Sequence, residues 1–90
     1  MAEELYNLII NFTGHKQIRL ELEQDEGRVE AVDFSFDRNL DTLLIENIDK
    51  ILKRNRITAL SLGAVKVAGA VDPNSSAYKI VQTWIEAIKS

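Results

Sequence analysis

The sequence predicts a small α/β domain, a sheet that carries two helices, and three features of the chain lead to this class. Three segments typical of strands lie within the first 36 positions, and one of them alternates apolar and charged side chains. Apolar residues then recur at helical spacing over 40–52. Finally, an apolar run at 64–71 passes through a short turn into a second helical pattern, as a buried strand does when it feeds a helix.

The first two strands are predicted from composition and from alternation. The segment from Leu5 to Phe12 is rich in strand formers, and the Thr-Gly-His-Lys sequence at 13–16 is typical of a turn. In the next segment apolar and charged residues alternate with a period of two, which predicts one buried face and one face in water. The apolar members are Ile18, Leu20 and Leu22, and the charged members are Arg19, Glu21 and Glu23.

A third strand follows a hairpin turn at 25–27 and runs from Arg28 to Phe36. Its apolar phase slips, because Val29 and Ala31 share one face whereas the later apolar residues share the other. Those later residues are Val32, Phe34 and Phe36. A bulge or a sharp twist near Ala31 would reconcile the two phases, so we predict an irregular strand at this point.

The first helix is predicted from leucine and isoleucine at three- and four-residue spacing. Its apolar residues are Leu40, Leu43, Leu44, Ile45, Ile48, Ile51 and Leu52. Asp37 or Asn39 is expected to cap the start, and Lys50, Lys53 and Arg54 gather near the end, where the helix dipole favours cations. The following segment, 57–62, fits either the start of a strand or a packed connection, and we favour the connection.

The run from Ala64 to Val71 is apolar at nearly every position apart from Lys66, which predicts a strand covered on both faces and central in its sheet. Pro73 and Asn74 favour a turn after it. Ser75 or Ser76 is then expected to cap a helix. The apolar residues that predict this helix are Ile80, Val81, Trp84, Ile85 and Ile88.

Length and composition limit the classes of protein that remain. Ninety residues make one domain, 1–90, and a chain this short is marginally stable unless it associates. It has no cysteine, which excludes a zinc finger or a thiol enzyme and fits a reducing cytoplasm. The net charge is −3 and no basic arm stands out, so direct nucleic acid binding is not expected. The sequence has neither a signal peptide at Met1–Glu4 nor an apolar segment of roughly 18 residues, so we expect a soluble, cytoplasmic protein without membrane contact.

The order of three strands, a helix, a strand and a helix resembles the first half of the ribonuclease H-like fold, which is also the repeating lobe of actin-like ATPases. That resemblance implies an antiparallel three-stranded meander, a central parallel strand and two helices packed on the sheet. Nucleases of this fold hold two metal ions with carboxylates at positions that correspond here to Asn11, Glu46 and Asp72. A neutral amide at Asn11 cannot bridge two cations, so these positions predict a degraded acidic site with no metal.

Other candidate chemistry is incomplete, so we expect no catalytic residue and no cofactor. His15 is the single histidine and falls in a turn, without a neighbouring nucleophile. The acidic residues at 21–26 could bind a cation, but a solvent-exposed strand face and a loop already account for them. The helix start at Ser75 could hold an anion, but it lacks the glycines and lysine of a phosphate loop. A divergent nuclease or resolvase that uses Glu46 and Asp72 stays as the alternative function.

The apolar surplus of the helices points to association instead. Apolar residues cover an arc of about 200° on the first helix and about 180° on the last one, whereas one buried stripe needs little more than about 100°. Part of this surface should therefore contact another protein. The predicted interface residues are Ile45, Ile48, Leu52, Tyr78 and Ile85.

Three short segments carry a resemblance to a known family. They are Asn11-Phe12-Thr13-Gly14, Asn39-Leu40-Asp41-Thr42-Leu43-Leu44 and Asp72-Pro73-Asn74-Ser75-Ser76-Ala77-Tyr78. With their spacing, they make the chain similar to the amino-terminal lobe of the TsaB/YeaZ family, a glycoprotease-like relative of the actin-like ATPases. That family provides the dimerisation subunit of the bacterial complex that makes threonylcarbamoyladenosine in transfer RNA.

The resemblance implies a scaffold rather than an enzyme. Members of the family form homodimers through helices of this lobe and support a larger actin-like catalytic subunit, which binds the nucleotide and the metal. The resemblance covers one lobe of the family. We therefore expect a non-catalytic interaction module for transfer RNA modification, whose partners are a second copy of the chain and this catalytic subunit.

Overall fold

The computed structural model of the chain describes residues 5–14, 16–24, 27–69, 72 and 74–89, with side chains described as far as 87. Its elements are β1 (Tyr6–Gly14), β2 (Gln17–Gln24), β3 (Gly27–Ser35), α1 (Leu40–Arg54), the short 3-10 helix η1 (Ala59–Ser61), β4 (Leu62–Gly69) and α2 (Ser76–Lys89). The prediction of a small α/β fold is confirmed. None of the helices in this described part is long and apolar enough to cross a membrane.

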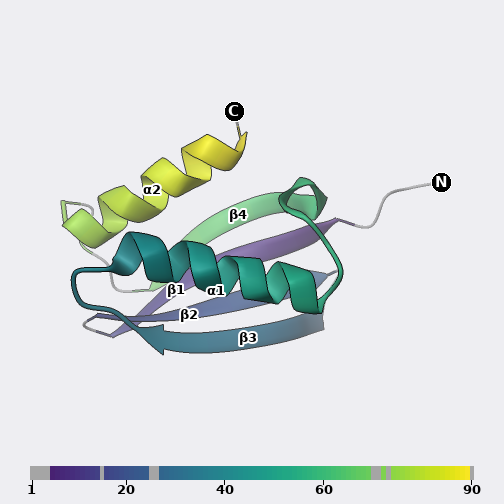
Figure 1. Cartoon of the computed structure of the whole chain (residues 1–90), viewed down its shortest axis with the longest axis horizontal. Coiled ribbons are helices and arrows are strands. Elements are labelled where there is room, and N and C mark those ends of the chain that lie inside the picture. Colours follow the sequence, from purple (N-terminus) through teal and green to yellow (C-terminus); the bar gives the residue numbers. More distant parts are fainter. Residues whose placement is uncertain (1–4, 15, 25–26, 70–71, 73, 90) are drawn as a thin grey trace.

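The four strands form one mixed sheet in the order β3-β2-β1-β4. β1, β2 and β3 are antiparallel neighbours, and β4 pairs with β1 in parallel. The predicted antiparallel meander and the parallel fourth strand are therefore both present. Figure 1 shows α1 crossing the sheet between β3 and β4, as a parallel connection requires.

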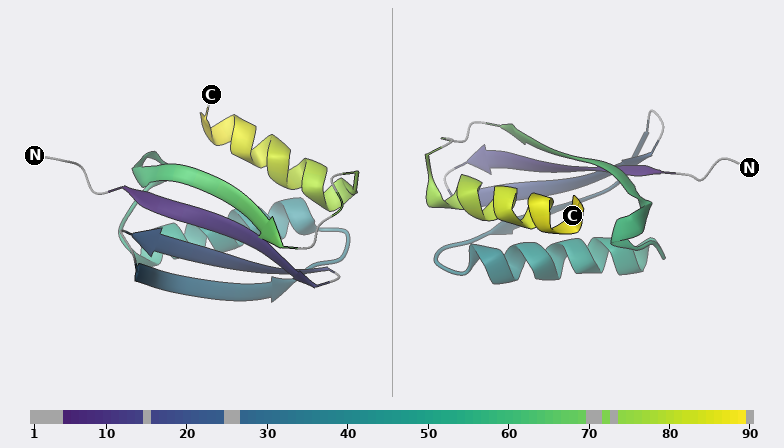
Figure 2. Two further views of the ribbon diagram at one scale, coloured as in Figure 1. Left: turned by 180° about the vertical axis from the view of Figure 1, so that it is seen from behind. Right: turned by 90° about the horizontal axis from the view of Figure 1, so that it is seen from above.

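The prediction that the apolar run at 64–71 is central and covered on both faces is wrong. β4 is an edge strand, and both helices cover the same face of the sheet (Figure 2). Val65 and Val67 pack against the core on the helix side, whereas Lys66 and Ala68 are exposed on the other side. The run looked buried because it joins strand-forming valines to small uncharged residues, not because two layers enclose it. Residues 70 and 71 lie outside the described part.

The core lies between the sheet and the two helices. Alternate residues of β1 and β2 point into it, which confirms the period of two expected for the second strand. α1 and α2 complete it from the other side. Its buried apolar residues are Leu8, Ile10, Phe12, Ile18, Leu20, Leu22, Leu40, Leu44, Ile48, Ile51, Leu52, Val81 and Ile85.

The predicted irregularity of the third strand is confirmed as a bulge. Leu22 faces Glu30 and the next residue of β2 faces Arg28, so Val29 is the extra residue, two positions before the point expected. Glu30 lies on the helix side of the sheet, in the same alternation as Val32 and Phe34, because its partner Leu22 lies in the core. There its carboxylate accepts hydrogen bonds from Arg54 and, at 3.1 Å, from Nδ2 of Asn55. These bonds fasten the end of α1 to β3, whereas the bulge beyond Glu30 places Arg28 on the open face of the sheet, where it pairs with Glu21.

The start of α1 differs from the expectation. Asn39 occupies the cap position but its side chain makes no capping hydrogen bond, and its Oδ1 instead accepts from the backbone N–H of Asp37 at 3.5 Å. The carboxylate of Asp37 pairs with Lys16 Nζ at 2.8 Å. Neither predicted side chain therefore caps the helix. The segment after α1 is a connection with one 3-10 turn, as favoured from the sequence.

The turn into α2 matches the expectation. Ser75 Oγ accepts a hydrogen bond from the backbone N–H of Tyr78 at 3.1 Å, which confirms Ser75 as the cap. Asp72 Oδ1 accepts from the backbone N–H of Asn74 at 2.9 Å. The carboxylate of Asp72 is therefore used to shape the turn. Pro73 lies outside the described residues.

Candidate interaction surface

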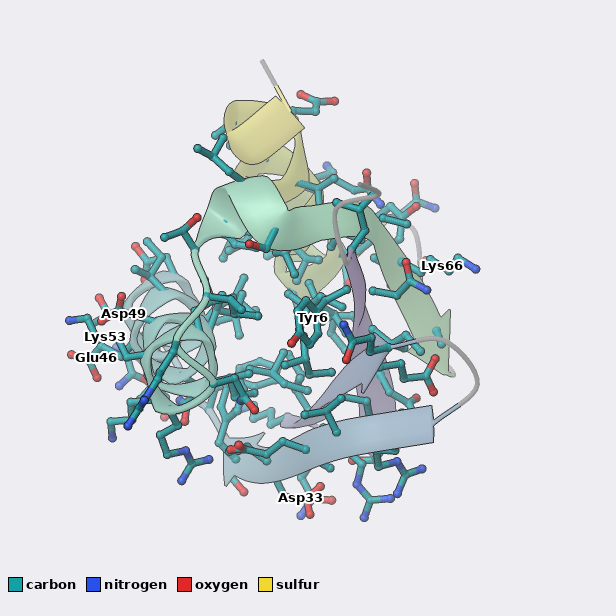
Figure 3. The ribbon with its side chains drawn as sticks, turned by 90° about the vertical axis from the view of Figure 1, so that its right-hand side faces the viewer. Tyr6, Asp33, Glu46, Asp49, Lys53 and Lys66 are labelled. Carbon is teal, nitrogen blue, oxygen red and sulfur yellow. The ribbon has the colours of Figure 1, made fainter. Side chains whose placement is uncertain are left out.

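The three acidic-site positions taken from the sequence do not come together. Asn11 alternates with the core residues of β1, so its side chain lies on the sheet face without helices. Glu46 is exposed on the flank of α1 that faces away from the sheet (Figure 3). The sheet therefore separates Asn11 from Glu46, and Asp72 serves the turn. Asn11 and Glu46 therefore do not meet in one two-metal site.

Acidic side chains elsewhere in the described part are mostly paired with bases. Glu21, buried on the open face of the sheet, pairs with Arg28 at 2.7 Å. Asp33 accepts a hydrogen bond from Nε of Arg19 at 2.8 Å, and this carboxylate raises the pKa of the Arg19 guanidinium. No group of three or more histidine or acidic residues that could hold a metal ion occurs among the described residues. His15, Asp25 and Glu26 lie outside them.

A hollow of about 380 Å³ lies where β2 begins and β3 ends. Its walls include Arg19 and Asp33, whose charges neutralise each other, together with uncharged residues such as Thr13 and Ser35. Since Arg19 and Asp33 pair with each other, the described lining of the hollow offers no charged group that is free to bind a ligand. We do not assign a function to it.

The predicted interface residues separate into two groups. Ile48, Leu52 and Ile85 are only 3%, 9% and 7% exposed, so the expectation that they lie on the surface is wrong. Two helices that lie side by side on one sheet face each bury an arc that contacts both the sheet and the other helix, and this explains the wide apolar arcs. Tyr78 is half-buried. Ile45 is 54% exposed, and it is the one clear surface residue of the set.

Ile45 borders an apolar groove between α1 and α2, with a volume of about 350 Å³. α1 contributes its first two turns to one wall, and α2 contributes the other wall. The lining residues are Asp41, Leu44, Ile45, Ile80, Thr83, Trp84 and Ala87. Asp41 and Thr83 are the polar members of this set. The groove is thus an open apolar surface that a side chain from another molecule can fill.

The sequence reasoning missed the α2 wall of the groove. Ile80, Trp84 and Ala87 are spaced four and three residues apart, so they form one flank of the helix. This spacing was available in the sequence, where Ile80 and Trp84 served only to predict the helix. The missing information was that α1 lies beside this flank and leaves its outer side open.

Comparison of the chain with protein families, with curated proteins and with solved structures finds no match.

Proposed function

We propose that the chain is a non-catalytic interaction module and that the groove between α1 and α2 is its docking surface. The observation that carries the proposal is the open apolar lining beside Ile45, which leaves more than half of this isoleucine in water. Exposed apolar surface of this kind is typical of protein contacts. Binding is further supported because the sheet separates Asn11 from Glu46, and because the carboxylate of Asp72 accepts a hydrogen bond within the turn.

We further propose that the fold is the first half of a ribonuclease H-like domain. The strand order β3-β2-β1-β4, with a helix between β3 and the parallel β4, supports this assignment. On the resemblance to the TsaB/YeaZ family, we propose a scaffold role in transfer RNA threonylcarbamoyladenosine synthesis. The proposed partners are a second copy and the larger actin-like catalytic subunit, and the proposed location is the cytoplasm. Ser75, one of the residues that carry the resemblance, forms the cap of α2 and gives that motif a structural role.

The test uses Ile45→Glu, because a carboxylate at the rim should block an apolar partner while the fold persists. The matched control is Val29→Glu, which introduces the same charge at another exposed apolar position, on the far edge strand. Self-association is measured by light scattering after size exclusion, and binding to the purified catalytic subunit by calorimetry. We expect Ile45→Glu to weaken association at least about tenfold, equivalent to about 1.4 kcal/mol, and Val29→Glu to leave it unchanged.

Trp84 provides a second readout, since it is the chain's single tryptophan and lines the groove. Its emission should shift to shorter wavelength when a partner covers the groove. A wild-type chain that stays monomeric up to about 100 μM and binds no catalytic subunit would overturn the proposal. An Ile45→Glu protein that folds and associates like wild type would do the same.

A further inference from the structure

We infer that the outer edge of β4 is a second docking site, where an extended segment of a different protein pairs with β4 as a further strand of the sheet. The segment carries apolar residues on the side that faces α2 and an acidic residue on the open side, opposite Lys66. This site is separate from the groove between α1 and α2, so the inference goes beyond the proposed function. It is carried by the contrast between the two sheet edges, by the position of α2 and by the charge of Lys66.

The two edges of the sheet differ in the features that prevent a strand from pairing with another chain. β3, at one edge, is interrupted by the bulge at Val29. It also carries the charged residues Arg28, Glu30 and Asp33. Bulges and charges are common protections of natural edge strands. β4, at the other edge, keeps a continuous register with β1 over 64–69, and this stretch has no proline and a single charge. The backbone N–H and C=O groups on the outer side of β4 can therefore pair with an added strand.

α2 extends past β4, so its outer flank lies beyond the edge of the sheet. Figure 1 and Figure 2 both show α2 on the helix side of the sheet and displaced outward from β4, which is the last strand of the described sheet. Tyr78 and Gln82 lie four residues apart on the flank of α2 that is turned away from the groove, and both are half-buried. A strand added beside β4 would place alternate side chains against this flank. Apolar residues at those positions would cover the ring of Tyr78.

Lys66 defines the charge of the segment that fits this edge. It is the single charged residue of β4, and Figure 3 shows its side chain pointing away from the helices, on the open side of the sheet. Its register partner on β1 is Ile9, so the neighbouring strand offers it no carboxylate. Lys66 has no ion pair with any described residue. An acidic residue opposite Lys66 in the added strand would supply one, because facing side chains of neighbouring strands lie close enough to interact.

The same lysine disfavours a second copy of the chain at this edge. Two β4 strands paired antiparallel about Lys66 would place the two lysines directly opposite each other. Like charges in that position destabilise a strand pair, and edge lysines prevent self-pairing in natural sheets. The occupant that fits is therefore a segment of a different protein, with a negative charge where a second copy has a positive one.

The experiment uses a capped eight-residue peptide in which valine alternates with threonine, with one central threonine replaced by glutamate. The peptide is titrated into the full-length chain, and binding is followed by NMR and by amide hydrogen exchange. We expect the amide signals of 64–69 to shift and the outward amides of β4 to exchange at least about tenfold more slowly in the complex, with no change along β3. No shift in β4 at about 1 mM peptide would overturn the inference.

The charge is tested by exchange between protein and peptide. Lys66→Glu should raise the dissociation constant of the glutamate peptide at least about fivefold, and a peptide with lysine in place of the glutamate should restore binding to this variant. Lys50→Glu makes the same change at an exposed position on α1 and should leave binding unchanged. If both variants weaken binding equally, only the net charge matters and the inference is wrong.

The backbone contribution is tested with a peptide N-methylated at the alternate residues whose N–H groups face β4. This peptide has the same side chains but lacks the donors, so it should fail to bind. Binding as tight as that of the parent peptide would show that no strand is added, and would overturn the inference.

The outcomes also separate this site from the groove. Ile45→Glu should leave binding of the glutamate peptide unchanged, because Ile45 borders the groove and not the β4 edge. If Ile45→Glu abolishes peptide binding, the peptide occupies the groove and the edge site is wrong, while the proposed function stands. If β4 amides become protected as the concentration of the protein alone is raised, a second copy occupies the edge and the inference also fails.

Discussion

The backbone of Gly69 lies so close to Phe12 that a Cβ atom at position 69 would overlap the Phe12 carbonyl oxygen. The two residues are register partners at the end of the parallel β1–β4 pair. Gly69 also has a φ of +92°, in the region that favours glycine. The place where β4 leaves the sheet toward α2 therefore requires a residue without a side chain.

Gly69→Ala should lower the free energy of unfolding by about 2–3 kcal/mol, because the new methyl group meets both a backbone clash and an unfavourable φ. Urea denaturation at one protein concentration measures the loss. The control is Gly63→Ala, since a Cβ at Gly63 would lie 3.1 Å from the Cβ of Leu5, a half-exposed side chain that can move. Equal losses for the two variants would contradict this account of Gly69.

The cap of α2 makes a second prediction. Ser75→Ala removes the acceptor for the Tyr78 N–H and should cost about 1 kcal/mol of unfolding free energy. Ser75→Asp keeps an acceptor at the same place and should retain most of the stability. Ser76→Ala is the neighbouring control, because Ser76 is exposed and begins the helix proper. Thermal unfolding followed by circular dichroism distinguishes the three, and a loss at Ser76 as large as at Ser75 would place the cap elsewhere.

The local patterns of the sequence predicted the elements well because each pattern has a local cause. The alternation around Ile18 and Leu20 indicates which face of the strand is buried, and it does so whatever element packs on that face. The phase slip near Ala31 likewise marks a bulge, because a strand with two apolar phases must shift register. The hydroxyl of Ser75 caps its own helix without help from distant residues.

The position of each element within the fold could not be predicted in the same way. Val65 and Val67 are apolar in an edge strand just as they would be in a central one, so the sequence does not show whether a neighbour covers β4. The apolar faces of the helices, which include Ile48 and Ile85, similarly predict that these residues are buried. They do not indicate whether the same chain or a partner protein buries them. Both questions depend on where α1 and α2 lie relative to each other and to the sheet.

The ion pair between Lys16 and Asp37 links the turn after β1 to the segment before α1 and predicts a pH effect. The hydrogen bond from Lys16, and then its charge, lower the pKa of the Asp37 carboxyl below its ordinary value. A carboxyl with a lowered pKa in the folded state adds stability above its unfolded-state pKa and loses it as the pH falls through the folded-state pKa. The contribution should therefore disappear on the acid side of the ordinary aspartate range.

Lys16→Met tests this link, since it keeps the length of the side chain and removes the charge. The pKa of Asp37, followed by carboxyl carbon chemical shifts in an NMR titration, should rise toward the ordinary aspartate value. Lys50→Met removes a lysine from the exposed side of α1 and is the control, for which the Asp37 titration should not move. An unchanged Asp37 pKa in Lys16→Met would show that the pair does not persist in solution.

Ile45 and Ile48 are three residues apart on α1, yet their substitution should have opposite effects. Ile48 is enclosed by the core, so Ile48→Ala should cost about 2–4 kcal/mol of unfolding free energy through lost burial and a residual cavity. Ile45→Ala removes a side chain that is 54% exposed and should change monomer stability by less than about 0.5 kcal/mol. Denaturant unfolding measured under conditions where the protein is monomeric separates the two effects.

Association should weaken in Ile45→Ala while the fold remains intact, whereas in Ile48→Ala any loss of association should follow the loss of folded protein. If Ile48→Ala instead dissociated a fully stable subunit, the original expectation that Ile48 lies in the interface would be correct and its burial in the core would be wrong.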